Sequence, residues 1–261
     1  MPKRRLSFYI HSEGASADSV RQALEWLISY PNKERGYIAV MSTKNLDGVI
    51  SGVLEDLHPS IVKTLKTKGS VRLGGKDISL VTMRKPIQSG NGLPMVVFFP
   101  SRDFLDQIDD IPDIEAVLVV PWNMKEIELW IRTWNATELG KQEKQAEPLI
   151  RNKVVEQALR YLTTRVNVST GITHPLDSSL AIQIFETLRD AGEEFAPDEV
   201  KAWLIAEGGW KASDAQKVAD LAKQVLNRKR LRKGPYNLEK DILRKWRESA
   251  SAETKTEENN E

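Results

Sequence analysis

The side chains best suited to acid–base chemistry lie near the start of the sequence. His11 directly follows an apolar run at residues 6–10, and Glu13 comes two residues later. A histidine beside a carboxylate can act as a general base or orient a ligand. His11, Glu13 and, after a later apolar run, Asp103 are therefore the candidate catalytic residues of an enzyme. The alternative is a structural histidine that hydrogen-bonds a loop carbonyl, because the spacing identifies no third partner.

The sequence predicts neither thiol chemistry nor a metal site. It contains no cysteine, which excludes a cysteine nucleophile, a disulfide and a zinc–cysteine cluster within this chain. Residues 103–113 are rich in aspartate, and four of the aspartates share a face at helical spacing, but the run lacks the glycine and glutamate of an EF-hand loop. We interpret these residues as a solvated helix and turn: Asp103, Asp106, Asp109, Asp110 and Asp113.

Polar side chains follow each of the apolar runs that are typical of strands. Ser12, Lys44, Arg102 and Asn123 occupy such positions, where the carboxyl ends of parallel strands form a ligand crevice. The sequence thus predicts a pocket for a nucleotide or another anion. The alternative is that the serines and Asn123 only cap the following helices, as we expect for Ser16 and Ser101. Neither a dinucleotide-binding glycine motif nor a Walker motif is present, so we expect no standard NAD or ATP site, and the sequence identifies no particular cofactor.

Positive charge is concentrated in the second half of the chain. Residues 1–140 contain 17 basic and 17 acidic side chains, whereas residues 228–247 contain nine basic and two acidic ones. Such a cluster favours phosphate binding through counterion release, although cations also stabilise a helix C-terminus and can face a protein partner. The candidate nucleic-acid contacts are Lys211, Lys217, Arg228, Lys229, Arg230, Arg232 and Lys233.

The helices expected before this cluster have helix-turn-helix proportions, but the charge lies at the wrong end of the presumptive recognition helix. A small helical packing module is the interpretation that we favour. Trp210 either stacks on a base or fills a gap between helices with its N–H paired. The core should contain three tryptophans that lie on apolar helical faces: Trp130, Trp134 and Trp203. The tryptophans in loops or near helix ends are Trp122, Trp210 and Trp246.

Four apolar runs, at residues 6–10, 37–41, 95–99 and 116–120, do not alternate with polar residues. Unbroken runs are typical of strands buried on both faces of a parallel sheet. Amphipathic helices separate them, and Gly74-Gly75 predicts the turn of a hairpin over residues 71–83. The predicted fold is α/β, a Rossmann-like doubly wound, mainly parallel sheet with an inserted antiparallel hairpin.

The second half is predicted to be an all-α helical domain. Pro197 begins one helix, Ser213 and Gln216 form a capping box for another, and residues 237–247 form the last. The expected organisation is a Rossmann-like domain at 1–140, a linker at 141–148, a helical domain with the basic segment at 149–248 and a disordered acidic tail at 249–261. That tail could compete with phosphate for the basic cluster.

Composition restricts the classes of protein further. The chain is 40% hydrophobic, carries a net charge of +1 and has no apolar run long enough to span a membrane. We expect a cytoplasmic binding or regulatory protein, in which the α/β domain senses a small anionic ligand or a protein and the helical domain contacts nucleic acid or a partner. The alternatives are a structural subunit of an assembly and a nucleotide-processing enzyme centred on His11, Glu13 and Asp103.

Overall fold

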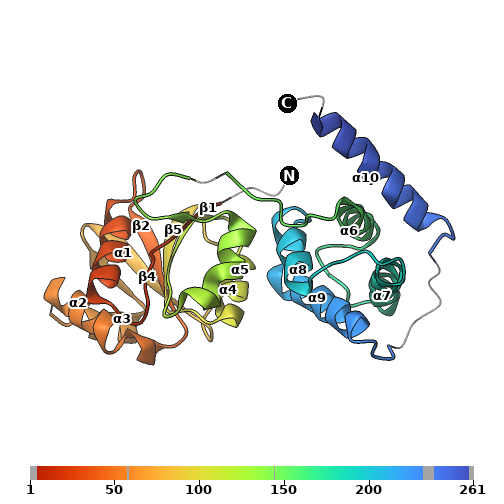
Figure 1. Cartoon of the computed structure of the whole chain (residues 1–261). Coiled ribbons are helices and arrows are strands. Elements are labelled where there is room, and N and C mark those ends of the chain that lie inside the picture. The colour runs from red at the N-terminus through yellow and green to blue at the C-terminus, as the bar shows by residue number, and fades with distance from the viewer. Residues whose placement is uncertain (1–4, 58, 144, 232–237, 259–261) are drawn as a thin grey trace. The chain divides into compact units, whose positions relative to one another are not determined.

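The chain folds into two compact units, Lys3–Ala146 and Glu147–Glu261 (Figure 1). The structure is a computed structural model that describes residues 5–57, 59–143, 145–231 and 238–258, with only the backbone of 254–258. Each unit is described below by itself. No helix in the described part of the chain combines the length and the apolar character that a membrane span requires.

The first unit is a mixed α/β structure built on a mainly parallel sheet. In the described residues the sheet has seven strands in the order β3-β4-β2-β5-β6-β1-β7, and only the pairing of β3 with β4 is antiparallel. The strands are β1 (Leu6–Tyr9), β2 (Arg35–Val40), β3 (Ser70–Leu73), β4 (Lys76–Thr82), β5 (Leu93–Phe98), β6 (Ile114–Val120) and β7 (Thr137–Glu138).

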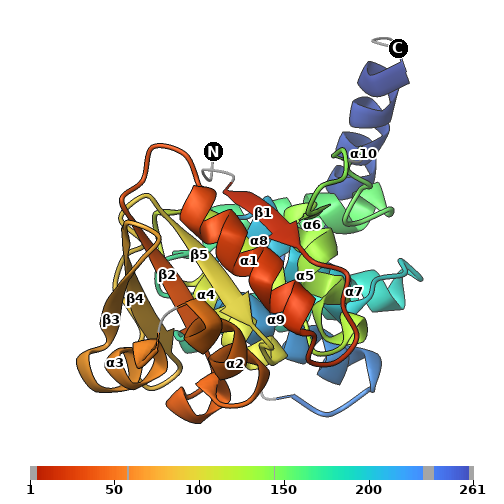
Figure 2. The ribbon, with the colours of Figure 1, turned by 90° about the vertical axis from the view of Figure 1, so that its left-hand side faces the viewer.

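Helices cover both faces of this sheet, as Figure 2 shows for α1 and α2 in front of the strands. On one face, α1 (Ala17–Ser29), α2 (Val49–Leu57) and α3 (Ile61–Lys68) share a core with the sheet. On the other face, α4 (Arg102–Asp109) and α5 (Met124–Trp134) form a second core. Successive strand residues alternate between the two cores; Val96 faces the first and Val97 the second. Burial on both faces explains why the strand sequences are apolar without interruption.

The predicted mainly parallel α/β sheet is therefore confirmed, with two differences in its topology. The hairpin forms, but β4 also pairs in parallel with β2, so only β3 is antiparallel. In addition, β6 and β5 separate β1 from β2, whereas the first two strands are neighbours in the 3-2-1-4-5-6 order of dinucleotide-binding sheets. Strand order depends on pairings between distant segments, which local sequence patterns do not specify.

The acidic run forms the expected helix and turn, but one of its aspartates is not solvated. Helix α4 ends at Asp109 and a turn follows it, and Asp103 and Asp113 are exposed. The Asp109 carboxylate is buried, forms an ion pair with Arg5 and accepts hydrogen bonds from the indole N–H groups of Trp130 (3.1 Å) and Trp134 (3.0 Å). The Arg5 guanidinium also lies 3.9 Å from the centre of a Trp134 ring. Asp109 is thus the centre of an internal cluster that joins the start of β1 to α4 and α5.

The described residues of the second unit form helices joined by short loops. They are α6 (Lys153–Arg165), α7 (Pro175–Asp190), α8 (Pro197–Ala206), α9 (Ala212–Leu226) and α10 (Ile242–Glu258). Helix α9 packs against α7 and α8, and α6 contacts α7, α8 and α10. Pro197 begins α8 as predicted, but α9 begins at Ala212 without a side-chain cap, so Ser213 and Gln216 form no capping box.

Helix α10 differs most from its prediction. It starts at Ile242 and continues to Glu258, through most of the segment that we expected to be a disordered tail. Ile242, Trp246 and Ala250 are buried at helical spacing, and Arg247 forms an ion pair with Glu193 (2.8 Å) in the loop after α7. Residues 249–253, four small residues and Glu253, therefore continue a helix where we expected a disordered tail. Residues 259–261 lie outside the described part of the chain.

Candidate functional site

The strand order creates a crevice between β2 and β5. From β2 the chain leads through α2 and α3 to β3 and β4 on one side, whereas from β5 it leads through α4 to β6 on the other side. Because neighbouring strands whose connections run in opposite directions leave a gap beyond their carboxyl ends, ligands of open α/β sheets bind at such points. The β2/β5 boundary is thus the place where this fold positions a site.

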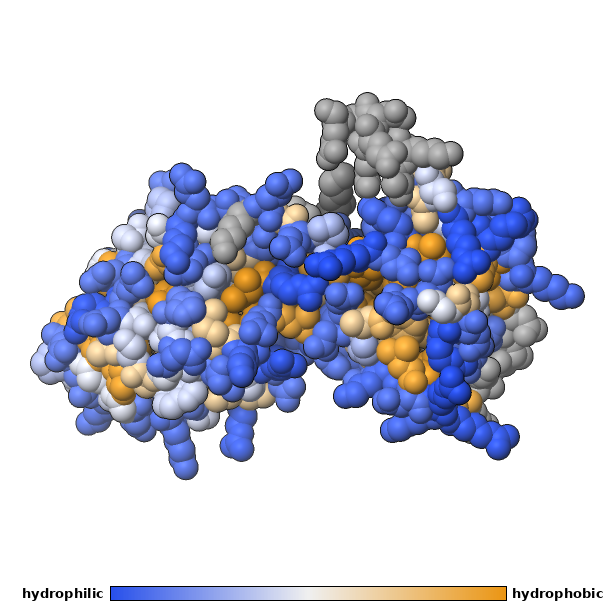
Figure 3. All heavy atoms as spheres, in the orientation of Figure 1, coloured by the Kyte–Doolittle hydropathy of each residue, from blue (hydrophilic) through white to orange (hydrophobic). Residues whose placement is uncertain are grey.

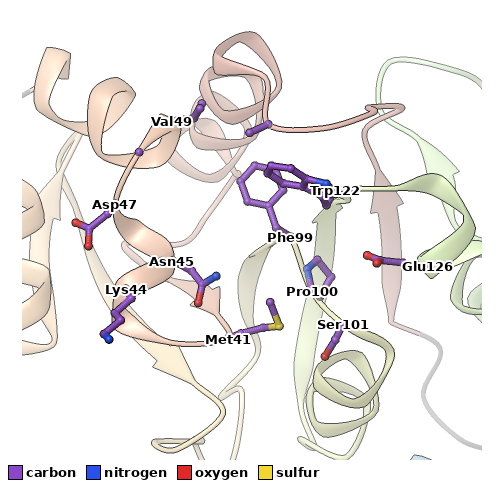
Figure 4. A pocket seen from close by; sticks show the side chains of 12 residues that line it. Met41, Lys44, Asn45, Asp47, Val49, Phe99, Pro100, Ser101, Trp122 and Glu126 are labelled. Atoms are coloured by element: carbon purple, nitrogen blue, oxygen red, sulfur yellow. The ribbon is translucent and has the colours of Figure 1, made fainter.

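A cavity of about 490 Å³ occupies this position (Figure 4). We call it the β2/β5 cavity. Its lining comes from the loops after β1, β2, β5 and β6 together with the starts of α2 and α5. The lining residues are Ala15, Met41, Lys44, Asn45, Asp47, Gly48, Val49, Phe99, Pro100, Ser101, Trp122 and Glu126. Its walls are mostly apolar, and a few polar groups enter from the two loops that flank the crevice.

Two aromatic rings form one wall of the cavity. Phe99 and Trp122 meet edge to face, with ring centres 5.7 Å apart and an interplanar angle of 83°. Trp122 remains 54% exposed, which is unusual for so large an apolar side chain. Its loop is held by a hydrogen bond from the Gly14 N–H to the Trp122 carbonyl (2.6 Å). The ring is therefore presented to the cavity from a backbone that is fixed to the loop after β1.

Phe99 has a strained backbone. Its φ is 47°, in the left-handed region that bulky side chains rarely adopt, and it precedes Pro100, which favours an extended residue before it. A hydrogen bond from the Phe99 N–H to the Val120 carbonyl (2.8 Å) holds this conformation. Such strain costs of the order of 1–3 kcal/mol and often occurs at functional sites. The turn ends β5 at Phe98 and places the Phe99 ring at the cavity.

The polar side of the cavity comes from the 3₁₀ helix η1 (Thr43–Leu46) after β2. The Asn45 side-chain oxygen accepts hydrogen bonds from both the Ser42 N–H (3.0 Å) and the Ser42 hydroxyl (2.6 Å), which leaves the Asn45 Nδ2 group to donate to a ligand. Lys44 is exposed and has no ion pair among the described residues, whereas Asp47 is paired with Lys66. Lys44 is thus the cation of this rim that is available for an anion.

Of the four predicted ligand-binding residues, Lys44 alone lines the cavity. Asn123 caps α5 by accepting from the Lys125 N–H (2.9 Å). Ser12 is buried, and its hydroxyl contacts the Gly14 carbonyl (3.3 Å). Arg102 is exposed at the start of α4 and is not part of the lining. The predicted capping roles of Ser16 and Ser101 are confirmed, because both side chains accept from backbone N–H groups of the helices that follow.

The candidate catalytic residues do not form a constellation. His11, Glu13 and Asp103 are all exposed, and no hydrogen bond or ion pair joins any two of them in the described structure. None of the three lines the β2/β5 cavity. Within the described residues there is also no group of three or more histidine or acidic side chains placed to hold a metal ion.

The predicted nucleic-acid contacts lie along α9 and beyond its end. Arg228, Lys229 and Arg230 are exposed and make no ion pair among the described residues, whereas Arg232 and Lys233 lie outside that part of the chain. Lys211 is exposed at the N-cap of α9, and Lys217 pairs with the buried Asp214 (2.8 Å).

Later in the basic segment, three more basic side chains form ion pairs with carboxylates. They are Arg244, Lys245 and Arg247 of α10. Arg228, Lys229 and Arg230 are therefore better candidates for phosphate than these three paired residues. Lys240, also exposed, makes no ion pair among the described residues either.

The tryptophans divide between packing and the site. Trp130 and Trp203 are in the core as predicted, whereas Trp134 is only partly buried against the second core. Trp210 is buried with its indole N–H donated to the Thr163 hydroxyl (3.0 Å), so it fills a gap between helices and is not a base-stacking platform. Trp246, expected in a loop or near a helix end, lies in the first half of α10 and is buried. Trp122 and Phe99 were missed as site residues; the signal available was Trp122 in a polar loop directly after an apolar run.

Comparison with known proteins found a family match for one part of the chain. Residues 151–247 match the model of a family described as a domain of unknown function (DUF1889), a stretch that contains α6–α9 and the start of α10. Searches of curated proteins and of solved structures found no match to this chain.

Proposed function

We propose that this is a cytoplasmic binding and regulatory protein whose α/β unit takes up a small anionic ligand with a flat ring in the β2/β5 cavity. The second unit would then contact nucleic acid through Arg228, Lys229 and Arg230. The observation that carries the proposal is the exposed Trp122, held edge to face against the strained Phe99 at the topological switch point of the sheet.

The aromatic wall supports a ligand with a flat ring. Trp122 contacts Phe99 through an edge-to-face arrangement, and half of its surface remains accessible in a cavity large enough for a small molecule. Stacking of a ring on such a side chain contributes about 1–3 kcal/mol. Met41 and Pro100 extend the apolar wall next to the aromatic pair.

The polar rim supports an anionic group on the same ligand. Lys44 supplies an available positive charge, the Asn45 Nδ2 group supplies a neutral donor, and Asp47 is already engaged by Lys66. Glu126 is the remaining carboxylate of the lining. One available cation opposite one carboxylate favours a ligand of low negative charge over a triphosphate, which needs several cations or a metal ion.

Binding is a better account of this cavity than catalysis. The lining contains no histidine, and the His11, Glu13 and Asp103 side chains form no hydrogen-bonded acid–base pair. The alternative of an assembly subunit would need a large exposed apolar patch. The face in Figure 3 is mainly hydrophilic with scattered hydrophobic areas. Among the described residues, the exposed large hydrophobic side chains lie on separate elements: Leu6, Leu57, Trp122, Leu176 and Leu226.

Calorimetric titration with adenosine 5′-monophosphate and with benzoate tests the cavity. We expect Trp122→Leu to weaken binding of the probe that binds by about tenfold or more, because the stacking surface is lost. Lys44→Gln should also weaken binding, and the affinity of this variant for adenosine 5′-monophosphate should approach its affinity for the uncharged nucleoside. Matched controls are Leu57→Ala, which removes a side chain of nearly equal exposure (52%), and Lys63→Gln, an exposed lysine outside the lining.

Binding that is equal in the Trp122 and Leu57 variants would refute the cavity as the site. Failure of both probes to bind the wild type would refute the proposed ligand class.

Fluorescence anisotropy with duplex DNA, single-stranded DNA and RNA at several salt concentrations tests the second unit. Neutralising Arg228, Lys229 and Arg230 with glutamine should weaken binding and reduce the salt slope by about 2.7 for duplex DNA, about 0.9 per lost phosphate contact. The control triple variant neutralises Arg244, Lys245 and Arg247, which are paired with carboxylates. Equal loss in both variants would contradict a specific role for the first three residues.

A further inference from the structure

A second cavity lies within the second unit, between α6 and α10. Its volume is about 370 Å³, and we call it the α6/α10 groove. Helix α6 lines one side and the segment from Glu239 to Ser249 lines the other. The lining residues are Gln157, Arg160, Tyr161, Thr164, Arg165, Glu239, Ile242, Lys245, Trp246 and Ser249.

Two buried donors of this lining have no acceptor. The indole N–H of Trp246 and the side-chain amide nitrogen of Gln157 are inaccessible at their atoms and form no hydrogen bond in the described structure. Trp246 is only 3% exposed, so its N–H was removed from water when α10 packed on α6. Buried donors in proteins are nearly always paired, and one without a partner reduces stability. Two in the wall of one groove indicate a ligand that brings acceptor atoms.

The basic side chains that line the groove limit the charge that the ligand can carry. Arg160 is paired with Glu156 (2.7 Å), and Lys245 is paired with Glu239. Arg165 makes no ion pair among the described residues; its guanidinium lies 5.0 Å from the centre of the Tyr161 ring. Arg165 is therefore the lining cation that is available for a ligand.

The aromatic contacts connect this cation to Trp246 through Tyr161. The Arg165 guanidinium lies over the Tyr161 ring, and that ring meets the Trp246 ring with 5.8 Å between ring centres. All three side chains line the groove, as does Gln157. One available guanidinium with two neutral donors matches a single carboxylate, which Arg binds through two parallel hydrogen bonds. A phosphate dianion would demand more positive charge.

We propose that the α6/α10 groove is a carboxylate-binding site, with Arg165 as the charged contact and Trp246 and Gln157 as neutral donors. This site is separate from the β2/β5 cavity and does not rest on its function. Glutamate or aspartate side chains of a peptide and free small carboxylates share the chemistry that these three residues recognise.

Nuclear magnetic resonance of the full chain tests the site through the indole N–H signal of Trp246, assigned by backbone connectivity. The probes are an acetylated, amidated Gly-Glu-Gly peptide, its Gly-Gln-Gly analogue, sodium acetate and inorganic phosphate, all at constant ionic strength. The glutamate peptide should shift the signal saturably, whereas the uncharged analogue should not. Acetate as effective as the peptide would assign the site to free carboxylates, and a tighter peptide would assign it to acidic chains.

Three variants complete the experiment. Arg165→Gln should weaken binding about tenfold, since a charge-assisted pair is lost, and Arg151→Gln, an exposed arginine outside the groove, should leave it unchanged. Gln157→Met should weaken binding about threefold or more without lowering the midpoint of thermal unfolding, because it removes an unpaired buried donor.

Four results would overturn the assignment. They are no saturable shift, an equal response to the glutamine analogue, phosphate binding as tight as the glutamate peptide, and equal affinity of the Arg165 and Arg151 variants. A lower unfolding midpoint in Gln157→Met would show that this amide is structural and exclude it from the site.

Discussion

Substitution of Asp109 by asparagine should be among the most destabilising isosteric changes in the α/β unit. The Asp109 side chain is 3% exposed and its ion-pair partner Arg5 is 6% exposed, so neutralisation leaves a buried guanidinium without a counter-charge. Removal of one partner from a buried ion pair costs about 3–5 kcal/mol. The new amide group of asparagine would also face the indole N–H of Trp130 or Trp134, donor against donor.

Urea unfolding of the full chain, monitored by tryptophan fluorescence, measures this loss. The matched control is Asp113→Asn, the same isosteric change four residues later at an exposed position with φ 59°, where asparagine is well tolerated. We expect about 3–5 kcal/mol for Asp109→Asn and less than about 0.5 kcal/mol for the control. A loss below about 1 kcal/mol, or equal losses in both variants, would refute the central role of this carboxylate.

A double-mutant cycle separates the ion pair from the indole hydrogen bonds. Arg5→Met leaves Asp109 with its two N–H donors, so it should cost less than Asp109→Asn, and the two changes together should cost less than their sum. The expected coupling is about 1–3 kcal/mol, typical of residues in one network. Strict additivity would show that Arg5 and Asp109 stabilise the unit independently.

Two further predictions concern pH dependence and backbone conformation. Burial, followed by the nearby Glu115 carboxylate, raises the pKa of Tyr30 from 10.0 to about 12. The stability contributed by the protonated phenol is therefore complete below pH 10 and is lost between pH 10 and about 12. In an ultraviolet titration the phenolate of Tyr30 should form late, and Glu115→Gln should shift its formation to lower pH; no shift would contradict the role of Glu115. Gly171→Ala should destabilise the second unit, because the new methyl carbon would lie 2.4 Å from the Asp214 side chain. The loss in thermal unfolding should clearly exceed the roughly 1–2 kcal/mol that the left-handed conformation alone costs an alanine. Gly192→Ala is the control; this glycine also has a positive φ but faces open space, so the variant should lose only about 1–2 kcal/mol.

The strands were predictable because their physical situation appears directly in the sequence. A strand covered by helices on both faces must be apolar at every position, and the run from Val117 to Val120 meets that condition in the two cores. The order of the strands was not predictable in the same way. The pairing of β1 with β6 joins residues 110 positions apart, such as Leu6 and Ala116, and no local pattern encodes it.

Helix α10 shows a different reason for failure. Its second half contains small and acidic residues, a composition typical of disorder when judged without its neighbours. The packed stripe has only Ile242, Trp246 and Ala250, and tertiary and i,i+4 ion pairs such as Arg247–Glu193 and Arg244–Glu248 add to it. A sparse stripe stabilises a helix only if another helix offers a matching face, which α6 does.

The lining of the β2/β5 cavity includes Lys44, which the sequence analysis predicted, and Phe99 and Trp122, which it missed. Phe99 shows why such a residue is missed. In the sequence, Phe99 appears as the last member of an apolar strand, but β5 ends at Phe98 and a φ of 47° turns the chain at the next residue. That conformation depends on the hydrogen bond to the Val120 carbonyl, a contact made only when β5 and β6 pair. Selection for stability alone would favour glycine at such a φ, because it relieves the strain at no steric cost. Phe99 is partly buried against the first core and also meets the half-exposed Trp122, so its ring contributes to packing and to the cavity wall at once. An aromatic side chain kept at this φ is consistent with the proposal that the wall receives a ligand.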